Sequence, residues 1–392
     1  MKKKILFITN TFPSNDRPNA GLFNYRAING LKKKNYISVL HLRSWKPFRK
    51  FFEISRVEDV TIYILSLPIL PTNNELIWAL QLFFYKRLSW FLIKSRMHEF
   101  SIIHSVGASF SGIVGSYFSR KTNLRHIAQC IGSDVNINLM KNYNHIGIKG
   151  WERNVNCFTC NSDALKQNIN YLYPNHSTKV IYRGVNLNEF QTNTDKTFDN
   201  CLNFLFIGGL SNRSETGYGR NYKGGETLLN AWKIFIENSN NPSENKLYFG
   251  GPEVTKEIAN ESISNYDLNF SNIEIIGELS KQKVIDYMSK AHVVIIPSFM
   301  EGFPNVAFEA MASSCAIIAS NVGGIPEIIK NNLNGILIEP GNVMSLSQAI
   351  NSFANNYYQS IEMGQLNRKL IEEKYSSEKF VEKYTKLYEQ SC

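Results

Sequence analysis

Cysteine is scarce in this sequence, with six residues among 392. That count is too low for a small secreted scaffold held together by disulfides, so this class is excluded. Four of the six lie in apolar runs that are typical of buried strands or helices, which favours a reducing compartment. Cys157 and Cys160 form a C-x-x-C pair, but no second pair follows. We expect them to be buried structural thiols, with a metal or redox role as the alternative.

Grouped metal ligands are missing as well. His, Cys and carboxylate residues nowhere follow metal-ligand spacing, and no D-x-D pair occurs. Sites that hold zinc or magnesium need several such ligands brought together. The sequence therefore predicts chemistry without a metal ion and without a bound cofactor.

A long uninterrupted apolar run is also absent. The basic start, MKKKILFITNTF, turns polar after about five apolar residues, too few for a signal peptide, so it reads as the first strand of a cytoplasmic protein. The most apolar stretch, 76–93, is interrupted by Gln81, Lys86, Arg87 and Ser89. We therefore predict no transmembrane helix. This stretch is either a helix packed on a sheet or an interfacial segment that dips into a membrane.

Acidic residues are few in the first half of the chain. Residues 1–185 contain 26 Lys and Arg against 9 Asp and Glu, whereas the rest contains 17 against 24, so the net charge of +10 divides into +17 and −7. A strongly basic half favours an anionic partner, which is a nucleic acid, a phosphate-bearing substrate or a membrane surface. Together with the apolar stretch, this charge leads us to expect peripheral attachment to an anionic surface, the inner face of a bacterial plasma membrane.

What the sequence does contain is a regular alternation of short β-rich runs with longer helical patterns. Its length and its 43% hydrophobic content fit two folded domains. The alternation predicts an α/β fold with two Rossmann-like domains, whose parallel sheets face an interdomain cleft. Strands are predicted at 5–9, 38–42, 62–65, 102–105, 126–129, 157–160, 179–181, 202–207, 246–249, 273–276, 293–296, 316–319 and 335–338.

The boundary between the two predicted domains lies in a polar stretch at 191–200. We predict an N-terminal domain over 1–190 and a C-terminal domain over 200–372. The last helix, 373–392, has no strand after it and is a candidate to return to the N-terminal domain. Because ligands of open parallel sheets bind outside the carboxyl ends of the strands, we expect the binding site between the domains.

One segment of the predicted C-terminal domain has the form of a phosphate site. In 293–324 a strand runs through a short loop directly into a helix that starts near Asn305. Asn305 is a good N-cap, and the free N–H groups of the first helical turn favour a diphosphate. Gly302 lets the backbone approach it closely. Glu309, one turn into the helix, leans back toward a ribose, while Glu301 faces the other side of the diphosphate, toward a hexose.

Taken singly, Glu309 and Glu301 also fit a simpler interpretation, in which one complements the helix dipole and the other is a solvated loop residue. The whole string EGFPNVAFE, with its flanking strand, the EAMA helix and the VGGIPE turn, resembles the E-x7-E pattern of the family-4 retaining glycosyltransferases, which have the GT-B fold. The resemblance covers nearly the whole chain and is strongest over 202–345. It implies a metal-independent hexosyltransferase whose nucleotide-diphosphate sugar is a co-substrate. It places Glu301 at the reaction and implies these donor-binding residues: Gly302, Phe303, Pro304, Asn305, Val306 and Glu309.

The resemblance also implies a lysine at the donor diphosphate. The segment FIGGLSNRSETGYGRNYKGGETLLNAW resembles the family's strand, loop and helix, and gives Lys223 the catalytic task of neutralising charge on the departing diphosphate. Gly209 stands where the family usually has an arginine. Arg213 and Arg183 are equal candidates for this second positive charge, and Arg220 is a further one.

Several weaker candidates follow from the same resemblance. Ile276 lies in a strand that resembles the one whose backbone contacts the base. The Gly21 turn resembles the family's loop near the donor phosphates, although glycines open helices in many folds. The turn CIGSDVN resembles a loop that often reads His-Gly-x-Asp, with Ile131 in the histidine position and Asp134 as the candidate base. In a front-face mechanism the leaving phosphate accepts the proton, so this loss of histidine is tolerable. His104, at a strand end, is expected to be buried and hydrogen-bonded, with a position in the cleft as the alternative.

Three functions are compatible with these features. The leading one is a retaining glycosyltransferase that transfers a sugar to a glycan acceptor linked to a lipid diphosphate, in the assembly of bacterial surface polysaccharide. A sugar-nucleotide epimerase on the same scaffold would carry its acids and bases in the first domain, where they are few. A nucleic-acid-binding protein would explain the basic half but predicts neither Glu301 nor Glu309, so we expect no nucleic-acid partner.

Overall fold

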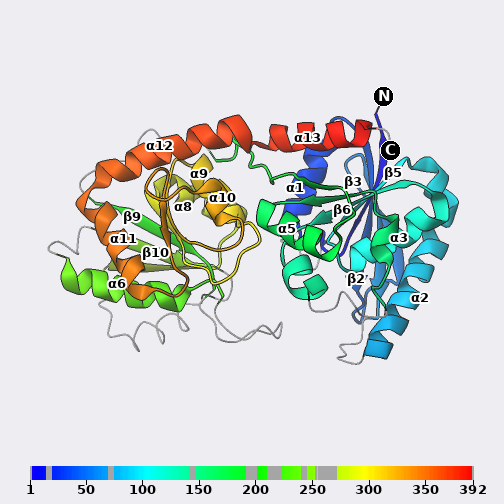
Figure 1. Ribbon diagram of the computed structural model, residues 1–392, viewed down its shortest axis with the longest axis horizontal. Coiled ribbons are helices and arrows are strands. Elements are labelled where there is room, and N and C mark those ends of the chain that lie inside the picture. Colours follow the sequence, from blue (N-terminus) through cyan, green and yellow to red (C-terminus); the bar gives the residue numbers. More distant parts are fainter. Residues whose placement is uncertain are drawn as a thin grey trace. The chain divides into compact units, whose positions relative to one another are not determined.

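The computed structural model describes residues 2–14, 20–68, 75–140, 147–190, 201–209, 222–239, 245–251, 254 and 272–390 (Figure 1). The chain forms two compact units, one comprising Met1–Tyr182 with Ser377–Cys392 and the other Arg183–Ser376. The predicted boundary at 191–200 falls outside the described residues. The last helix, α13 (Ser377–Glu389), belongs to the first unit.

The first unit is built on an eight-stranded sheet in the order β3-β4-β2-β1-β5-β6-β7-β8. Its strands are parallel apart from the β3–β4 pair, which is antiparallel. The seven strands predicted for this part of the chain are confirmed, and they are β1 (Lys4–Thr9), β2 (Tyr36–Ser44), β4 (Val60–Leu67), β5 (Ile102–Val106), β6 (Arg125–Cys130), β7 (Cys157–Cys160) and β8 (Thr178–Val180).

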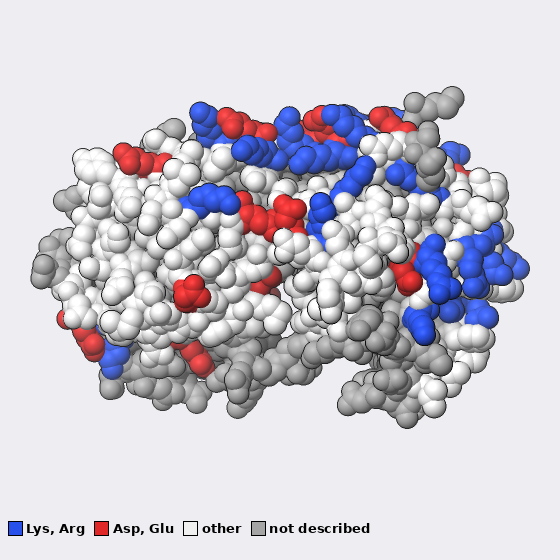
Figure 2. Space-filling view, viewed as in Figure 1, with Lys and Arg blue, Asp and Glu red and all other residues white. Residues whose placement is uncertain are grey.

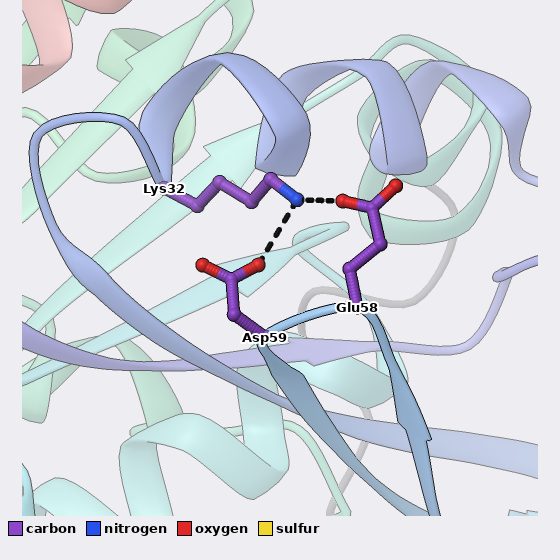
Figure 3. Close-up of polar contacts among 3 residues, drawn as sticks. All are labelled: Lys32, Glu58 and Asp59. Carbon is purple, nitrogen blue, oxygen red and sulfur yellow. Dashed lines mark hydrogen bonds and ion pairs between the residues drawn. The ribbon is translucent and has the colours of Figure 1, made fainter.

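The strand β3 (Phe52–Val57) was not predicted. It lies at the sheet edge and is mostly exposed, so its sequence lacks the apolar run of its neighbours. The tight turn from β3 to β4 is bonded to the end of a helix, because the Lys32 ammonium donates to Glu58 and, at 3.0 Å, to Asp59 (Figure 3). These two bonds raise the pKa of Lys32. Solvent screens these three charges, so their contact orients the hairpin more than it stabilises the unit.

Helices cover both faces of this sheet. One face packs against α1 (Leu22–Leu31) and α13, and the other against α2 (Glu75–Ile93), α3 (Phe110–Thr122) and α5 (Asp163–Leu172). Short helical turns η1 (Lys94–Glu99), η2 (Asp134–Leu139) and η3 (Trp151–Asn154) connect them. α13 is fixed through its tyrosines: the hydroxyl of Tyr388 lies 2.6 Å from Nδ1 of His104, and that of Tyr384 lies 2.9 Å from the Thr159 hydroxyl.

The C-x-x-C pair lies on β7, and both side chains are buried and free of disulfides. Burial raises the pKa of the Cys157 thiol, which keeps it protonated and unreactive. Their predicted burial is confirmed.

Three buried histidines, His41, His104 and His126, make the first unit sensitive to acid. From an ordinary value of 6.5, burial lowers the pKa of His104 and His126 to about 3 and that of His41 to about 4. A histidine buried in its neutral form stabilises the fold fully above its unfolded pKa and loses that stabilisation as the pH falls. Between pH 6.5 and 5 each should therefore lower the free energy of unfolding by roughly 2 kcal/mol. The burial predicted for His104 is confirmed.

Denaturant unfolding at both pH values measures this loss. His126→Gln should remove about one histidine's share of the pH dependence, whereas the change His98→Gln at an exposed position should leave it intact. Identical pH dependence in wild type and His126→Gln would contradict the assignment.

The second unit contains a six-stranded parallel sheet in the order β11-β10-β9-β12-β13-β14. All six predicted strands are confirmed as β9 (Asn203–Ile207), β10 (Lys246–Gly250), β11 (Ile273–Gly277), β12 (Val293–Ile296), β13 (Ala316–Ser320) and β14 (Ile336–Ile338). The chain moves outward from β9 to β11 and then returns to the other side of β9. Strands β9 and β12 therefore flank the point where strand order reverses, which is where such sheets bind ligands.

One face of the second sheet packs against α6 (Gly225–Asn238), α11 (Val343–Asn355) and α12 (Tyr357–Lys374), around the buried Trp232. Helices α8 (Lys281–Lys290) and α9 (Asn305–Ala312) contact β9, β12 and β13. A single helical turn, α10 (Ile325–Ile328), follows β13. Each unit is thus a sheet between two helical layers, as predicted.

The apolar helix of the first unit differs from expectation in one respect. The helical stretch Leu76–Glu99 is long and apolar enough, by length and composition alone, to cross a membrane, although no such segment was predicted. Within this stretch, only 22% of the apolar 18-residue segment is buried in the fold.

Candidate active site

Three loops of the second unit meet at the carboxyl ends of its central strands. They are 222–224 before α6, 297–304 after β12 and 321–324 after β13. The amide of Phe299 donates to the Tyr222 carbonyl at 2.7 Å, and that of Gly324 donates to the Gly302 carbonyl at 3.0 Å. The loop after β12 is thus bonded to a neighbouring loop on each side.

Two glycines allow these loops to come this close. Gly224 has a φ of 76°, and a Cβ there would lie 2.0 Å from the Pro297 carbonyl oxygen. Gly323 has a φ of 55°, and its Cβ would lie 1.9 Å from the carbonyl oxygen of Glu301. Only glycine combines this backbone conformation with such contact. The G-G turns of the sequence are therefore steric requirements of the site.

Lys223 and Glu301 form the charged centre of this loop cluster. Nζ of Lys223 lies 2.6 Å from Oε1 of Glu301, and the hydroxyl of Ser298 donates to the same oxygen at 2.8 Å. The carboxylate side chain is only 8% exposed, against 31% for the lysine. Both bonds described for Glu301 end on Oε1, which leaves Oε2 for another donor. The sequence pattern predicts separate contacts for the two residues and indicates neither their pairing nor the bond to Ser298.

The helix α9 starts beside this pair, as predicted, but its cap differs. Pro304 is the N-cap and Asn305 the first helical residue, and the N-cap side chain makes no capping hydrogen bond. Proline has no polar side-chain atom, so it leaves the amides of Asn305 and Val306 open to an external acceptor, whereas the Ala307 amide donates to the Pro304 carbonyl at 3.2 Å. An uncapped helix N-terminus with its dipole attracts an anion such as a phosphate group.

The other candidate residues of this unit have different surroundings. Phe303 is buried and its ring stacks on Phe308 at 4.7 Å, so its side chain belongs to the core. Val306 and Glu309 are half-buried on α9. Ile276 is half-buried on β11, and its side chain lies against Gly250, the last residue of β10. The donor-binding roles assigned to these residues stay predictions.

No candidate for the second positive charge at the donor diphosphate is confirmed. Arg213 and Arg220 lie outside the described residues, as does most of the loop that follows Gly209. Arg183 is described, half-buried in the stretch after β8, at the start of the second unit. Its proposed contact with the donor stays a prediction.

In the first unit, Gly21 occupies a strained turn that opens α1. Its φ is 69°, and a Cβ would lie 2.5 Å from the Thr11 carbonyl group. The Asn24 side chain fixes this approach, because it donates to the Thr9 hydroxyl at 2.9 Å and to the Thr11 carbonyl at 2.7 Å. The glycine is therefore required by the fold of this loop, whatever ligand the loop contacts.

Asp134 is buried at the start of η2. Its carboxylate accepts backbone N–H bonds from Ala108 at 2.6 Å, Gly132 at 2.7 Å and Ile131 at 3.0 Å. Burial raises its pKa, while these bonds oppose the rise. The contacts give Asp134 the task of holding the Ile131–Gly132 turn. Its burial counts against a role as catalytic base, which stays a prediction.

Within the ranges that the structure describes, no three His, Cys, Asp or Glu side chains gather as a metal site. A metal-independent reaction stays a prediction.

The sequence of this chain is similar to those of known glycosyltransferases. The family description "Glycosyl transferases group 1" matches residues 217–390. Over 289 residues the chain is 32% identical to the uncharacterized glycosyltransferase MJ1178 of Methanocaldococcus jannaschii, covering 74% of this chain and 75% of the relative. Over 371 residues it is 24% identical to TuaC of Bacillus subtilis, a putative teichuronic acid biosynthesis glycosyltransferase, with 89% of each covered. CapM of Staphylococcus aureus, a capsular polysaccharide biosynthesis glycosyltransferase, is 26% identical over 52% of each chain.

Solved structures share the fold of the whole chain. Sucrose-phosphate synthase from Thermosynechococcus elongatus matches with a TM-score of 0.75 at 18% identity, over 99% of this chain and 98% of that one. Anabaena Alr3699/HepE in complex with UDP matches with a TM-score of 0.71 at 16% identity, over 99% of both chains. At these identities the likeness shows the GT-B fold. The family match and the 32% identical relative show that the chain belongs to the group 1 glycosyltransferases.

Proposed function

We propose that this chain is a retaining, metal-independent hexosyltransferase that uses a nucleotide-diphosphate sugar. The observation that carries the proposal is the Lys223–Glu301 pair beside the uncapped N-terminus of α9. A cation and open amides at one place suit a diphosphate, and a fixed cation there neutralises the charge that develops as the sugar leaves. Glu301, held through Oε1, presents Oε2 to a hydroxyl of the hexose.

The acceptor is, by this proposal, a glycan on a lipid diphosphate, and the product a surface polysaccharide. The names of the capsular and teichuronic acid relatives support this context. The structures of Anabaena Alr3699/HepE with UDP and with UDP-glucose support a uridine nucleotide as the first donor to test.

Removal of the Glu309 carboxylate should weaken donor binding. If Glu309 accepts ribose hydroxyls, Glu309→Ala loses charge-assisted hydrogen bonds, and the KM for the donor should rise by roughly 10- to 100-fold with a smaller change in kcat. Steady-state kinetics measures the two constants. Glu237→Ala, which removes an exposed carboxylate on α6, is the matched control and should change neither. An unchanged KM in Glu309→Ala would remove this residue from the site.

Two further measurements test the class of reaction. A thermal-shift panel of UDP-, GDP- and ADP-sugars should identify the donor, because ligand that binds the folded state raises the melting temperature. Nuclear magnetic resonance of the product should then show the donor's anomeric configuration retained, with a rate that EDTA does not change. An inverted product, or a rate abolished by EDTA and restored by a divalent cation, would contradict the proposal.

A further inference from the structure

The outer face of α2 is apolar and exposed. Leu80, Phe83, Phe84 and Phe91 are 56%, 43%, 61% and 66% exposed. The opposite side of the helix is buried in the first unit through Leu82, Tyr85, Ser89 and Ile93. Positions three or four residues apart share one side of a helix, so α2 has a stripe that packs inward and an apolar stripe that faces outward. Large aromatic stripes exposed in this way mark interaction surfaces.

Cations gather beside the outer stripe. Lys86 of α2 and Arg120 and Lys121 at the end of α3 all lie within 6 Å of the Tyr117 ring, at 5.8, 5.7 and 5.9 Å from its centroid. None of the three forms an ion pair with a described carboxylate. Burial, aided by Arg87 and Arg120, lowers the pKa of Lys86. Figure 2 shows blue side chains over the part of the first unit where Figure 1 labels α2 and α3.

A groove joins the stripe to these cations. It encloses about 510 Å³ between α2, α3 and residues 147–154. Leu80, Phe83 and Ile113 supply apolar walls, while Lys86 and Arg120 supply charge. The surface therefore combines an apolar floor with a cationic edge.

We infer that the outer face of α2, the end of α3 and this groove form a docking surface for a bilayer that contains anionic phospholipids. Leu80, Phe84 and Phe91 enter the boundary between headgroups and acyl chains, and the cations meet lipid phosphates. α2 lies flat in the interface because its inner face is buried in the first unit. A nucleic acid would satisfy the cations but would leave the aromatic stripe in water. The inference goes beyond the proposed function, since it requires neither a sugar donor nor an acceptor.

Sedimentation of the full, donor-free chain with vesicles tests the inference. Phosphatidylcholine vesicles with roughly 30 mol% phosphatidylglycerol should bind at least about ten-fold more tightly than pure phosphatidylcholine at about 0.1 M salt. Raising the salt to about 1 M should release the protein, because screening removes the electrostatic attraction. Equal binding to both vesicles, or no binding, would overturn the inference. Retention after salt and alkaline carbonate washes would also overturn it, in favour of a membrane-spanning helix.

Paired variants separate the contribution of the aromatic side chains to vesicle binding from that of the cations. Phe84→Ser with Phe91→Ser should weaken binding to anionic vesicles at least about ten-fold, because two interfacial anchors are lost. Tyr171→Ser, at an exposed aromatic position on α5, should not. Arg120→Glu with Lys121→Glu should weaken binding by at least a similar factor. Lys33→Glu with Lys34→Glu makes the same change in net charge at exposed positions after α1 and should have a much smaller effect. These sites are exposed, so the variants should fold, which their melting temperatures check.

Duplex DNA provides the last arm of the test. Tight binding of DNA that competes with the vesicles and is insensitive to Phe84→Ser with Phe91→Ser would identify a nucleic-acid surface and overturn the inference. Transfer to a water-soluble acceptor should persist in all these variants, so failure of membrane docking and failure of the proposed transferase activity are distinguishable.

Discussion

Replacement of Lys223 by alanine should lower kcat by about 100- to 1000-fold, the range seen when one preorganised group that stabilises developing charge is removed. In the structure the ammonium is held 2.6 Å from Glu301, a carboxylate that is 8% exposed and also bonded to Ser298. The charge is therefore in position before a donor binds and needs no reorganisation during transfer. The effect should fall on turnover more than on donor affinity, because charge on the diphosphate grows as the sugar leaves.

A matched variant separates this effect from the loss of any lysine–glutamate pair. Lys246 is paired with Glu274 at 2.5 Å in the same unit, but the pair is more than 40% exposed and Lys246 lies at the amino end of β10. Lys246→Ala should leave kcat within about two-fold of wild type, since exposed pairs contribute little. Equal losses in both variants, or full turnover in Lys223→Ala, would refute the catalytic role.

Alanine at Gly224 should both destabilise the second unit and abolish most of the activity. Its Cβ would lie 2.0 Å from the Pro297 carbonyl oxygen at a φ of 76°, so the loop that carries Lys223 must move away from the loop that carries Glu301. We expect a loss of about 3 kcal/mol or more in the free energy of unfolding. We also expect a fall of roughly 100-fold in kcat, because a displacement of about 1 Å is enough to misplace a catalytic group.

Gly277→Ala is the control for backbone strain alone. Its φ of 69° matches that of Gly224, but its Cβ would meet its nearest neighbour, the Val254 carbonyl oxygen, only at 3.6 Å. The cost should be about 1–2 kcal/mol, the usual penalty of a left-handed conformation. Calorimetric unfolding measures both variants, and equal destabilisation would contradict the steric explanation for Gly224.

The sequence predicts buried strands well and exposed ones poorly. The strand β12 and, from Phe204 on, the strand β9 are continuous apolar runs, because central strands of parallel sheets are covered on both faces. The strand β3 contains Glu53 and Arg56 and has one face in solvent, so its pattern resembles that of a loop. Its place in the sheet follows from antiparallel pairing with β4, a tertiary contact that its own residues do not encode.

Some features of the candidate site could likewise be predicted from the sequence, and others could not. The position of α9 could be predicted because strand, loop and helix are contiguous in the chain. The Lys223–Glu301 bond joins residues 78 positions apart and depends on glycine contacts between loops, which no local pattern reports. Ser298 could have been suspected only as a hydroxyl three residues before Glu301. The Pro304 cap shows that even a good capping residue such as Asn305 can be the first residue of the helix instead.

An experimental structure of the complex with a nucleotide-diphosphate sugar would locate the donor diphosphate. We expect a phosphate oxygen within about 3 Å of Nζ of Lys223, another at the same distance from an amide of the first turn of α9, and a sugar hydroxyl bonded to Glu301. A diphosphate bound away from α9, with Lys223 still paired only to Glu301, would contradict it.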